Sequence, residues 1–75
     1  MSRPLYEIAS ESRKDWSPVN YAAKPYLDAM RELSSINDDY YADSGRSVVA
    51  YFLSNASSWR GENARRIKAE LKSMK

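Results

Sequence analysis

The side chains in this chain that could perform acid–base chemistry are carboxylates, lysines, tyrosines and hydroxyls, because its 75 residues include no cysteine and no histidine. Their absence excludes disulfide bonds, catalytic triads built on either residue, and zinc sites with nitrogen or sulfur ligands. A chain this short rarely forms the deep pocket that shifts the pKa values of the remaining groups. We therefore expect a protein that is not an enzyme, with no catalytic residues, no cofactor and no metal.

An acidic segment with two adjacent tyrosines is the first candidate binding feature. Tyr40 and Tyr41 stand among Asp38, Asp39 and Asp43. Tyrosine is enriched in protein interfaces, so the segment predicts partner binding through Tyr40 and Tyr41. The spacing lacks the alternating ligands and the glycine of a calcium loop, and turn formation explains the aspartates more simply.

Trp59, Arg60 and Gly61 form the most distinctive tripeptide. A tryptophan next to an arginine can anchor an interface, which adds Trp59 and Arg60 to the predicted partner contacts. Trp59 also continues the helical spacing of Val48 and Phe52, and this pattern favours a role in the core. Both interpretations stay open at this stage.

The C-terminal segment is basic, since six lysines and arginines stand against two glutamates from Ser57 onward. A row of cations can meet phosphates, so a nucleic acid is the alternative partner. A solvated face that complements the helix dipole explains the same charges without a ligand. The alternative predicts nucleic-acid contacts through Arg65, Arg66, Lys68 and Lys72.

Two further expectations concern the same segment. Glu62, Arg66 and Glu70 are spaced to form ion pairs one helical turn apart. A turn at Gly61 between two helices invites comparison with a DNA-binding helix-turn-helix motif. Because the charged residues Arg60 and Glu62 flank the glycine, an ordinary helical hairpin is favoured.

Apolar residues recur at helical spacing in four segments, which must position these surfaces. The first helix covers residues 4–16, the third begins at Asp43 or Ser44, and the fourth begins near Glu62. We predict an all-α fold, a compact bundle of about four helices without strands, forming a single domain over residues 1–75. The predicted core consists of Leu5, Ile8, Met30, Val48, Phe52, Ile67 and Leu71.

The second helix leaves two interpretations open. Ser17 and Pro18 suit an N-cap and a first helical position, which predicts a helix from Pro18 onward. Pro25 falls inside that pattern, where it would remove a backbone hydrogen bond and clash with the carbonyl of Tyr21. We expect either a kink at Pro25 or two short helices meeting near Lys24.

Localisation and assembly follow from hydropathy and size. No segment approaches the ~18 consecutive apolar residues of a membrane span, and the first residues lack the apolar part of a signal peptide. The expected location is the cytoplasm, with no membrane contact. Small domains without disulfides often gain stability from association, so a homodimer is a further expectation.

Three segments carry a resemblance to a known group of proteins: Tyr21 to Met30 (YAAKPYLDAM), Tyr51 to Gly61 (YFLSNASSWRG) and Ala64 to Lys72 (ARRIKAELK). The sequence resembles small helical proteins encoded by tailed bacteriophages and prophages, for which no activity is established. The resemblance implies an accessory phage protein in the bacterial host cytoplasm. It also implies that the partner is a bacterial host or phage protein, such as a host enzyme or defence complex that is inhibited or redirected.

Overall fold

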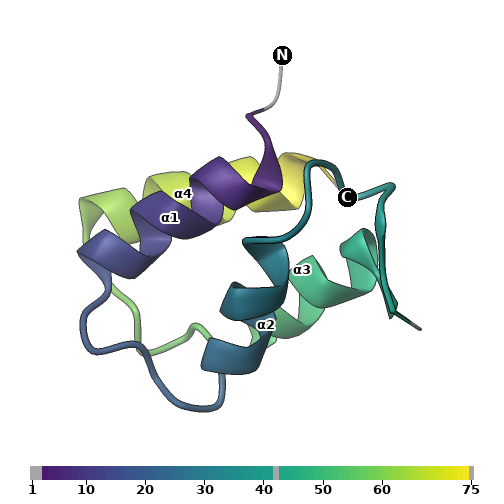
Figure 1. The fold of residues 1–75 in the computed structure, drawn as a ribbon. Helices are drawn as coiled ribbons and strands as arrows, with labels where there is room; N and C mark the ends of the chain where they lie inside the picture. The colour runs from purple at the N-terminus through teal and green to yellow at the C-terminus, as the bar shows by residue number, and fades with distance from the viewer. Residues whose placement is uncertain (1–2, 42, 75) are drawn as a thin grey trace.

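Four helices and one short hairpin make up the part of the chain that the computed structural model describes, residues 3–41 and 43–74 (Figure 1). The prediction of a mostly helical fold with about four helices is confirmed. The expectation of a purely helical protein is wrong, because two strands of two residues each pair in antiparallel register. The elements are α1 (Leu5–Asp15), α2 (Lys24–Met30), β1 (Asp39–Tyr40), β2 (Asp43–Ser44), α3 (Gly45–Ser54) and α4 (Glu62–Met74).

The helices pack in two pairs, with α1 against α4 and α2 against α3, and α1 also contacts α2 (Figure 1). Helices α1 and α4 run antiparallel: Arg3, just before α1, bonds to Glu70 near the end of α4. At the other end, Asn63 at the start of α4 donates to Asp15 at the end of α1. Along residues 3–41 and 43–74, no helix combines the length and apolar character needed to cross a membrane.

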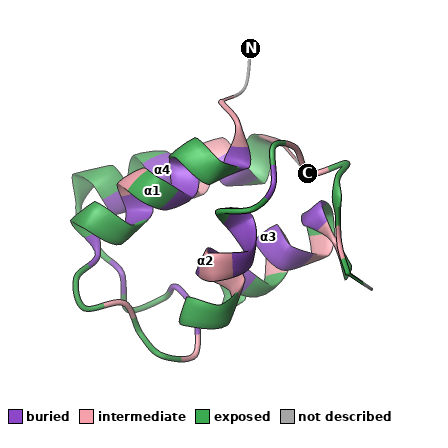
Figure 2. Ribbon diagram, in the orientation of Figure 1, coloured by how far each residue is buried: buried purple, intermediate pink, exposed green. Residues whose placement is uncertain are grey.

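The core lies where the inner faces of all four helices meet (Figure 2). Each of the seven predicted core residues is buried, which confirms the helical spacing from which they were inferred. Ser12 is the buried polar residue of this core, and its hydroxyl donates to the carbonyl of Ile8 at 2.8 Å. That bond within α1 satisfies the hydroxyl without a partner from another element.

The second helix begins later than predicted. It is one helix, neither kinked at Pro25 nor preceded by a short helix that meets it near Lys24. Residues 16–23 are turns and irregular backbone, and α2 opens at Lys24 with Pro25 in its first turn. A proline inside a helix costs about 3 kcal/mol, whereas in the first turn its missing N–H leaves no bond unmade. Asn20 supports the late start, because its side chain accepts from the N–H of Ala22 and its carbonyl accepts from Lys24.

The start of α3 fits its prediction and fixes the hairpin before it. Ser44 is the N-cap, and its hydroxyl accepts from the N–H of Ser47 at 3.1 Å. Gly45 donates its N–H to the carbonyl of Asp38 at 2.6 Å, so the loop lies directly on the first turn of α3. A Cβ at Gly45 would stand 2.7 Å from the carbonyl oxygen of Ser35, which explains a glycine there. The predicted start of α4 at Glu62 is also confirmed.

Candidate functional site

The two predicted contact tyrosines meet at the tip of the β1–β2 hairpin. Their rings pack edge to face with centroids 4.7 Å apart. Tyr41 is 88% exposed, whereas Tyr40 is half-buried and packs against the core. Tyr41 also has a φ of 56°, in the left-handed region that glycine and asparagine adopt most readily. The hairpin therefore presents one phenol to solvent and uses the other to support it.

Tyr40 is bonded to the segment that follows α2. Its hydroxyl lies 3.4 Å from the carboxylate of Glu32, to which it donates a long hydrogen bond. Removal from water raises the pKa of Tyr40, and the nearby negative charge of Glu32 raises it further. The phenol is thus neutral at physiological pH, and its proton remains available to Glu32.

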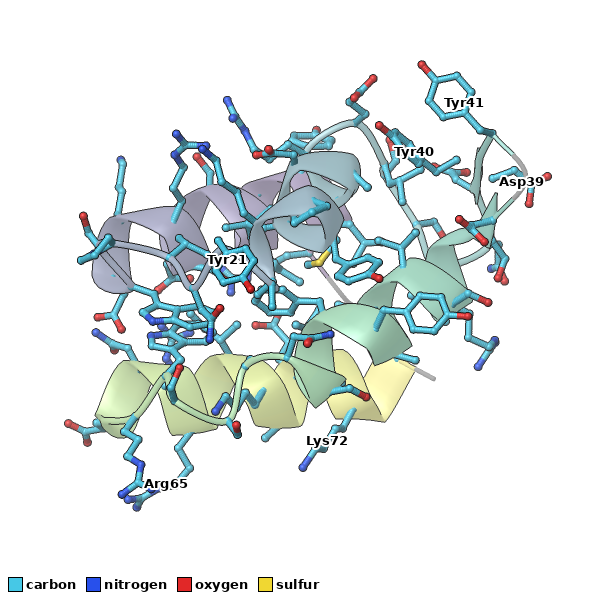
Figure 3. All side chains as sticks on the ribbon, turned by 90° about the horizontal axis from the view of Figure 1, so that it is seen from below. Tyr21, Asp39, Tyr40, Tyr41, Arg65 and Lys72 are labelled. Atoms are coloured by element: carbon cyan, nitrogen blue, oxygen red, sulfur yellow. The ribbon has the colours of Figure 1, made fainter. Side chains whose placement is uncertain are left out.

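The aspartates of this segment divide into two groups. Asp38 serves the loop, because its carboxylate accepts from the N–H groups of Ser34 and Ser35 at 2.9 and 3.1 Å. Asp39 and Asp43 are exposed on the two strands. We call the surface formed by Asp39, Tyr40, Tyr41 and Asp43 the tyrosine tip (Figure 3). Among residues 3–41 and 43–74, no acidic cluster is arranged to hold a metal ion.

Trp59 occupies the core. Only 2% of its surface is exposed, and its ring stacks on Trp16 with centroids 5.5 Å apart. The indole Nε1 donates to the carboxylate of Asp15 at 2.8 Å, which satisfies the one polar group of the ring. Hydrogen bonds from Asn63 and then from Trp59 hold the pKa of Asp15 below its usual range. This placement removes Trp59 from the predicted contact set and agrees with the core interpretation.

One flank of α4 is neutralised by α1. Arg66 pairs with Glu11, and Arg3 binds Glu70 through two hydrogen bonds of 2.7 and 3.0 Å. Arg3 also bonds to Glu11 at 2.7 Å. The expected pairing of Arg66 with Glu62 and Glu70 along α4 is therefore replaced by pairs between helices.

The pKa values on this flank reflect the network. Hydrogen bonds from Arg3 and then Arg66 lower the pKa of Glu11, and the bonds from Arg3 lower the pKa of Glu70. Both carboxylates are consequently charged at neutral pH and engaged with arginines. Arg66 is thus committed to Glu11, which sets it apart from the other predicted nucleic-acid contacts.

The opposite flank of α4 carries cations that have no acidic partner within hydrogen-bonding distance among the described residues. We call Arg65, Lys68 and Lys72, together with Arg60 of the connection before α4, the basic flank. Figure 3 shows Arg65 and Lys72 projecting from α4 away from the body of the molecule, on the side opposite Tyr41. Arg60, predicted as a protein contact, lies with this group, since it helps line a pocket with Arg65 and Lys68.

Lys68 is the most enclosed member of the basic flank. Its ammonium donates to the carbonyl of Trp59 at 2.6 Å and lies 5.8 Å from the centre of the Trp59 ring. Desolvation foremost, and then the charges of Lys72 and Arg60, lower the pKa of Lys68. The lowered pKa therefore reflects chiefly the partial burial of the ammonium, with smaller contributions from the two neighbouring cations. The spacing of the cations along the sequence predicted this row. The contact of Lys68 with Trp59 could be found only from the tertiary structure.

The packing of α4 fits neither of the two expectations for α3 and α4, a helix-turn-helix motif or an ordinary helical hairpin. A helix-turn-helix motif joins its helices by a turn of about three to four residues. Here residues 55–61 separate α3 from α4, and α4 packs on α1 while α3 packs on α2. The basic flank is thus presented by a helix that packs against α1 on its buried side.

In comparisons with known proteins, the chain matches no family model, no curated protein and no solved structure.

Proposed function

We propose that this protein is a non-enzymatic binding protein that acts through protein–protein contact at the tyrosine tip. The observation that carries the proposal is Tyr41, which combines 88% exposure with a left-handed backbone. Packing within the chain does little to stabilise a tyrosine at this position, and the backbone conformation favours asparagine or glycine. Binding to a partner supplies a physical reason for the phenol.

The support beneath Tyr41 suits a contact residue. Its ring rests on Tyr40, and the base of the hairpin is bonded to the first turn of α3 through Gly45 and Asp38. A side chain already held by its neighbours loses less conformational entropy on binding, so more of the contact energy appears as affinity. Tyrosine also buries a large area with only two side-chain torsions to fix.

The charges around the tip indicate the chemistry of the partner. Asp39 and Asp43 are exposed on either side of the tyrosine pair, and Glu32 lies beneath Tyr40. A complementary surface would offer an apolar pocket for the Tyr41 ring and lysines or arginines around its rim. We propose a bacterial host factor or defence complex with such a surface, in keeping with the resemblance to phage proteins.

The test compares two single substitutions at equally exposed tyrosines. Tyr41→Asn removes the phenol at a position whose backbone suits asparagine, and Tyr21→Asn is the matched control, since Tyr21 is also 88% exposed. Tagged wild type and both variants would be used for affinity capture from nuclease-treated bacterial lysate, with mass spectrometry of the retained proteins. Purified partner would then be titrated with each variant by calorimetry.

The proposal expects one protein to be retained by wild type and Tyr21→Asn and lost with Tyr41→Asn. The purified partner should bind Tyr41→Asn at least tenfold more weakly, the usual size of a hot-spot effect of about 1.4 kcal/mol or more. Equal affinity of all three proteins for the partner would show that the tip is not the contact. A loss with Tyr21→Asn alone would place the contact on another surface.

A further inference from the structure

The two flanks of α4 differ in the ion pairs that they form with the rest of the chain. Arg65 and Arg66 are neighbours in sequence, yet Arg66 has a carboxylate partner from α1 and Arg65 is exposed without one among the described residues. Lys68 and Lys72 lie on the same side as Arg65, one and two turns further along α4. At a rise of about 1.5 Å per residue, the row from Arg65 to Lys72 is about 10 Å long.

Concentrating these charges works against folding. Like charges one helical turn apart repel each other and destabilise a helix. Lys68 and Lys72 form such a pair, and Arg60 adds a third charge close to Lys68. Partial withdrawal from water beside Trp59 is the largest cause that lowers the pKa of Lys68, and the charges of Lys72 and Arg60 lower it further. An anion bound to this flank would offset the repulsion between these cations and would favour the charged form of Lys68.

A shallow pocket of about 270 Å³ lies at one end of the row. Arg60, Arg65 and Lys68 line it together with Ser57 and Gly61, so its side-chain charges are all positive. Gly61 has a φ of 116°, and no atom lies within 4 Å of the position that a Cβ would occupy. The backbone is thus open to a ligand in the pocket that Arg60, Arg65 and Lys68 line.

The absence of exposed apolar groups on this flank identifies the type of anion. In the described parts of the chain, the large exposed hydrophobic side chains are tyrosines of α1, α3 and the loops, none of them on α4 or its preceding connection. A protein interface needs a buried apolar or aromatic centre, and a membrane-binding helix needs apolar side chains to insert. A phosphate backbone needs only a row of cations and hydrogen-bond donors.

We propose that the basic flank binds the phosphate backbone of a nucleic acid without regard to base sequence. Arg60, Arg65 and Lys68 hold one phosphate at the pocket, and Lys72 contacts a neighbouring phosphate further along the row. Arg66 takes no part, because Glu11 neutralises it on the other flank. This surface is separate from the tyrosine tip, so either proposal can stand when the other fails.

The experiment measures binding of a fluorescein-labelled DNA duplex of about 20 base pairs, and of the corresponding single strand, by anisotropy at several salt concentrations. Arg65→Glu/Lys72→Glu disrupts the row. Lys24→Glu/Arg46→Glu is the control, since it changes the net charge equally at exposed positions in the first turns of α2 and α3. Circular dichroism and thermal melting check that each variant is folded.

Two neutralised phosphates give a slope of about −1.8 in log K against log salt for a duplex, which is a loss of about tenfold between about 50 and 200 mM salt. Arg65→Glu/Lys72→Glu should bind at least tenfold more weakly at the lowest salt, with about half the slope. The control should bind within about threefold of wild type, because its substitutions lie outside the row. If the glutamate variant melts early, Arg65→Gln/Lys72→Gln replaces it with the same expected slope.

Three results would overturn the proposal. The first is no binding of either DNA at the lowest salt. The second is an equal loss in the two double variants, which would assign the binding to net charge alone. The third is binding of a poly-glutamate peptide as tight as that of the duplex, which would assign the flank to an acidic protein instead.

Discussion

The indole rings of Trp16 and Trp59 are stacked, with centroids 5.5 Å apart and planes 4° from parallel. Trp16 directly follows α1, and Trp59 lies in the connection that precedes α4. Phe52 of α3 meets both indoles edge-on, at 6.3 and 6.2 Å. A single aromatic cluster therefore joins three helices at the end of the molecule where α1 finishes and α4 begins.

Removing the ring of Trp59 should be severely destabilising. We expect Trp59→Ala to lower the free energy of unfolding by about 3–5 kcal/mol, comparable to the whole stability of a domain of this size. Trp59→Phe should cost less, because it keeps a ring against Trp16 and loses the Nε1 bond to Asp15. Urea denaturation followed by circular dichroism measures both. Tyr6→Ala is the control, because the ring of Tyr6 is half exposed. If Tyr6→Ala lost as much stability as Trp59→Ala, the assignment of Trp59 as a main core residue would be contradicted.

The Arg3 network should contribute stability that depends on pH. Arg3 lowers the pKa values of Glu70 and Glu11 in the folded protein. The contribution of each pair is therefore complete above the unfolded glutamate pKa of about 4.5, and it is lost as the pH falls through the lower folded values. Because the three side chains are a quarter to a third exposed, we expect Arg3→Gln to cost only about 1 kcal/mol at pH 7.

Stability curves of wild type and Arg3→Gln between about pH 2 and pH 7 test this linkage. The difference between the two proteins should shrink as the pH falls below about 4 and should also shrink in high salt. Arg13→Gln serves as the control, since its 3.4 Å pair with Asp28 is about half exposed and should contribute little. A difference that stays constant down to the lowest pH would mean that Arg3 acts through packing alone.

Tyr41→Asn should stabilise the isolated protein. Asparagine adopts the left-handed backbone of this position more readily than tyrosine, and the gain should be about 1 kcal/mol. The ring of Tyr41 contributes little to offset it, because the side chain is exposed and touches chiefly Tyr40. Thermal melting would detect a rise of several degrees, with Tyr21→Asn unchanged as the reference. A lower melting temperature would show that the Tyr40–Tyr41 contact outweighs the backbone term.

The two glycines should respond differently to alanine. A Cβ at Gly45 would meet the carbonyl oxygens of Ser35 and Asp38 at 2.7 and 3.0 Å, so backbone must shift and we expect a loss of about 1–3 kcal/mol. Gly61 has open space, and Gly61→Ala should cost about 1 kcal/mol through its positive φ alone. Chemical denaturation ranks the two variants. Equal stability of Gly45→Ala and wild type would contradict the close approach of the loop to α3.

The first, third and fourth helices and the core followed from residue spacing alone. Leu5 and Ile8 in α1, Val48 and Phe52 in α3, and Ile67 in α4 recur at the helical period, and all are buried. The sequence also offered Asp43 or Ser44 as the N-cap of α3, and the structure has Ser44, whose cap bond joins residues only three apart. Such features depend on the geometry of one helix and on nothing outside it.

The second helix and the hairpin lay beyond local patterns. Pro18 and Pro25 each suit the first turn of a helix, so the sequence offered two starts for the second helix. The structure has the later start, at which Pro25 blocks no hydrogen bond. The strands have two residues each, too short for a periodic signal of their own. Their pairing is accompanied by the bond from the N–H of Gly45 to the carbonyl of Asp38, which joins the loop to the first turn of α3.

The partners of charged and aromatic side chains were decided by tertiary structure. Helical spacing offered Arg66 the glutamates of its own helix, but α1 brings Glu11 to it from 55 residues away. Arg3 and Glu70 meet across 67 residues for the same reason, because antiparallel docking of α1 and α4 places opposite charges side by side. Docking also buried Trp59 and left Tyr41 exposed. Sequence spacing determines which residues share a helical face, whereas the packing of helices determines what each face meets.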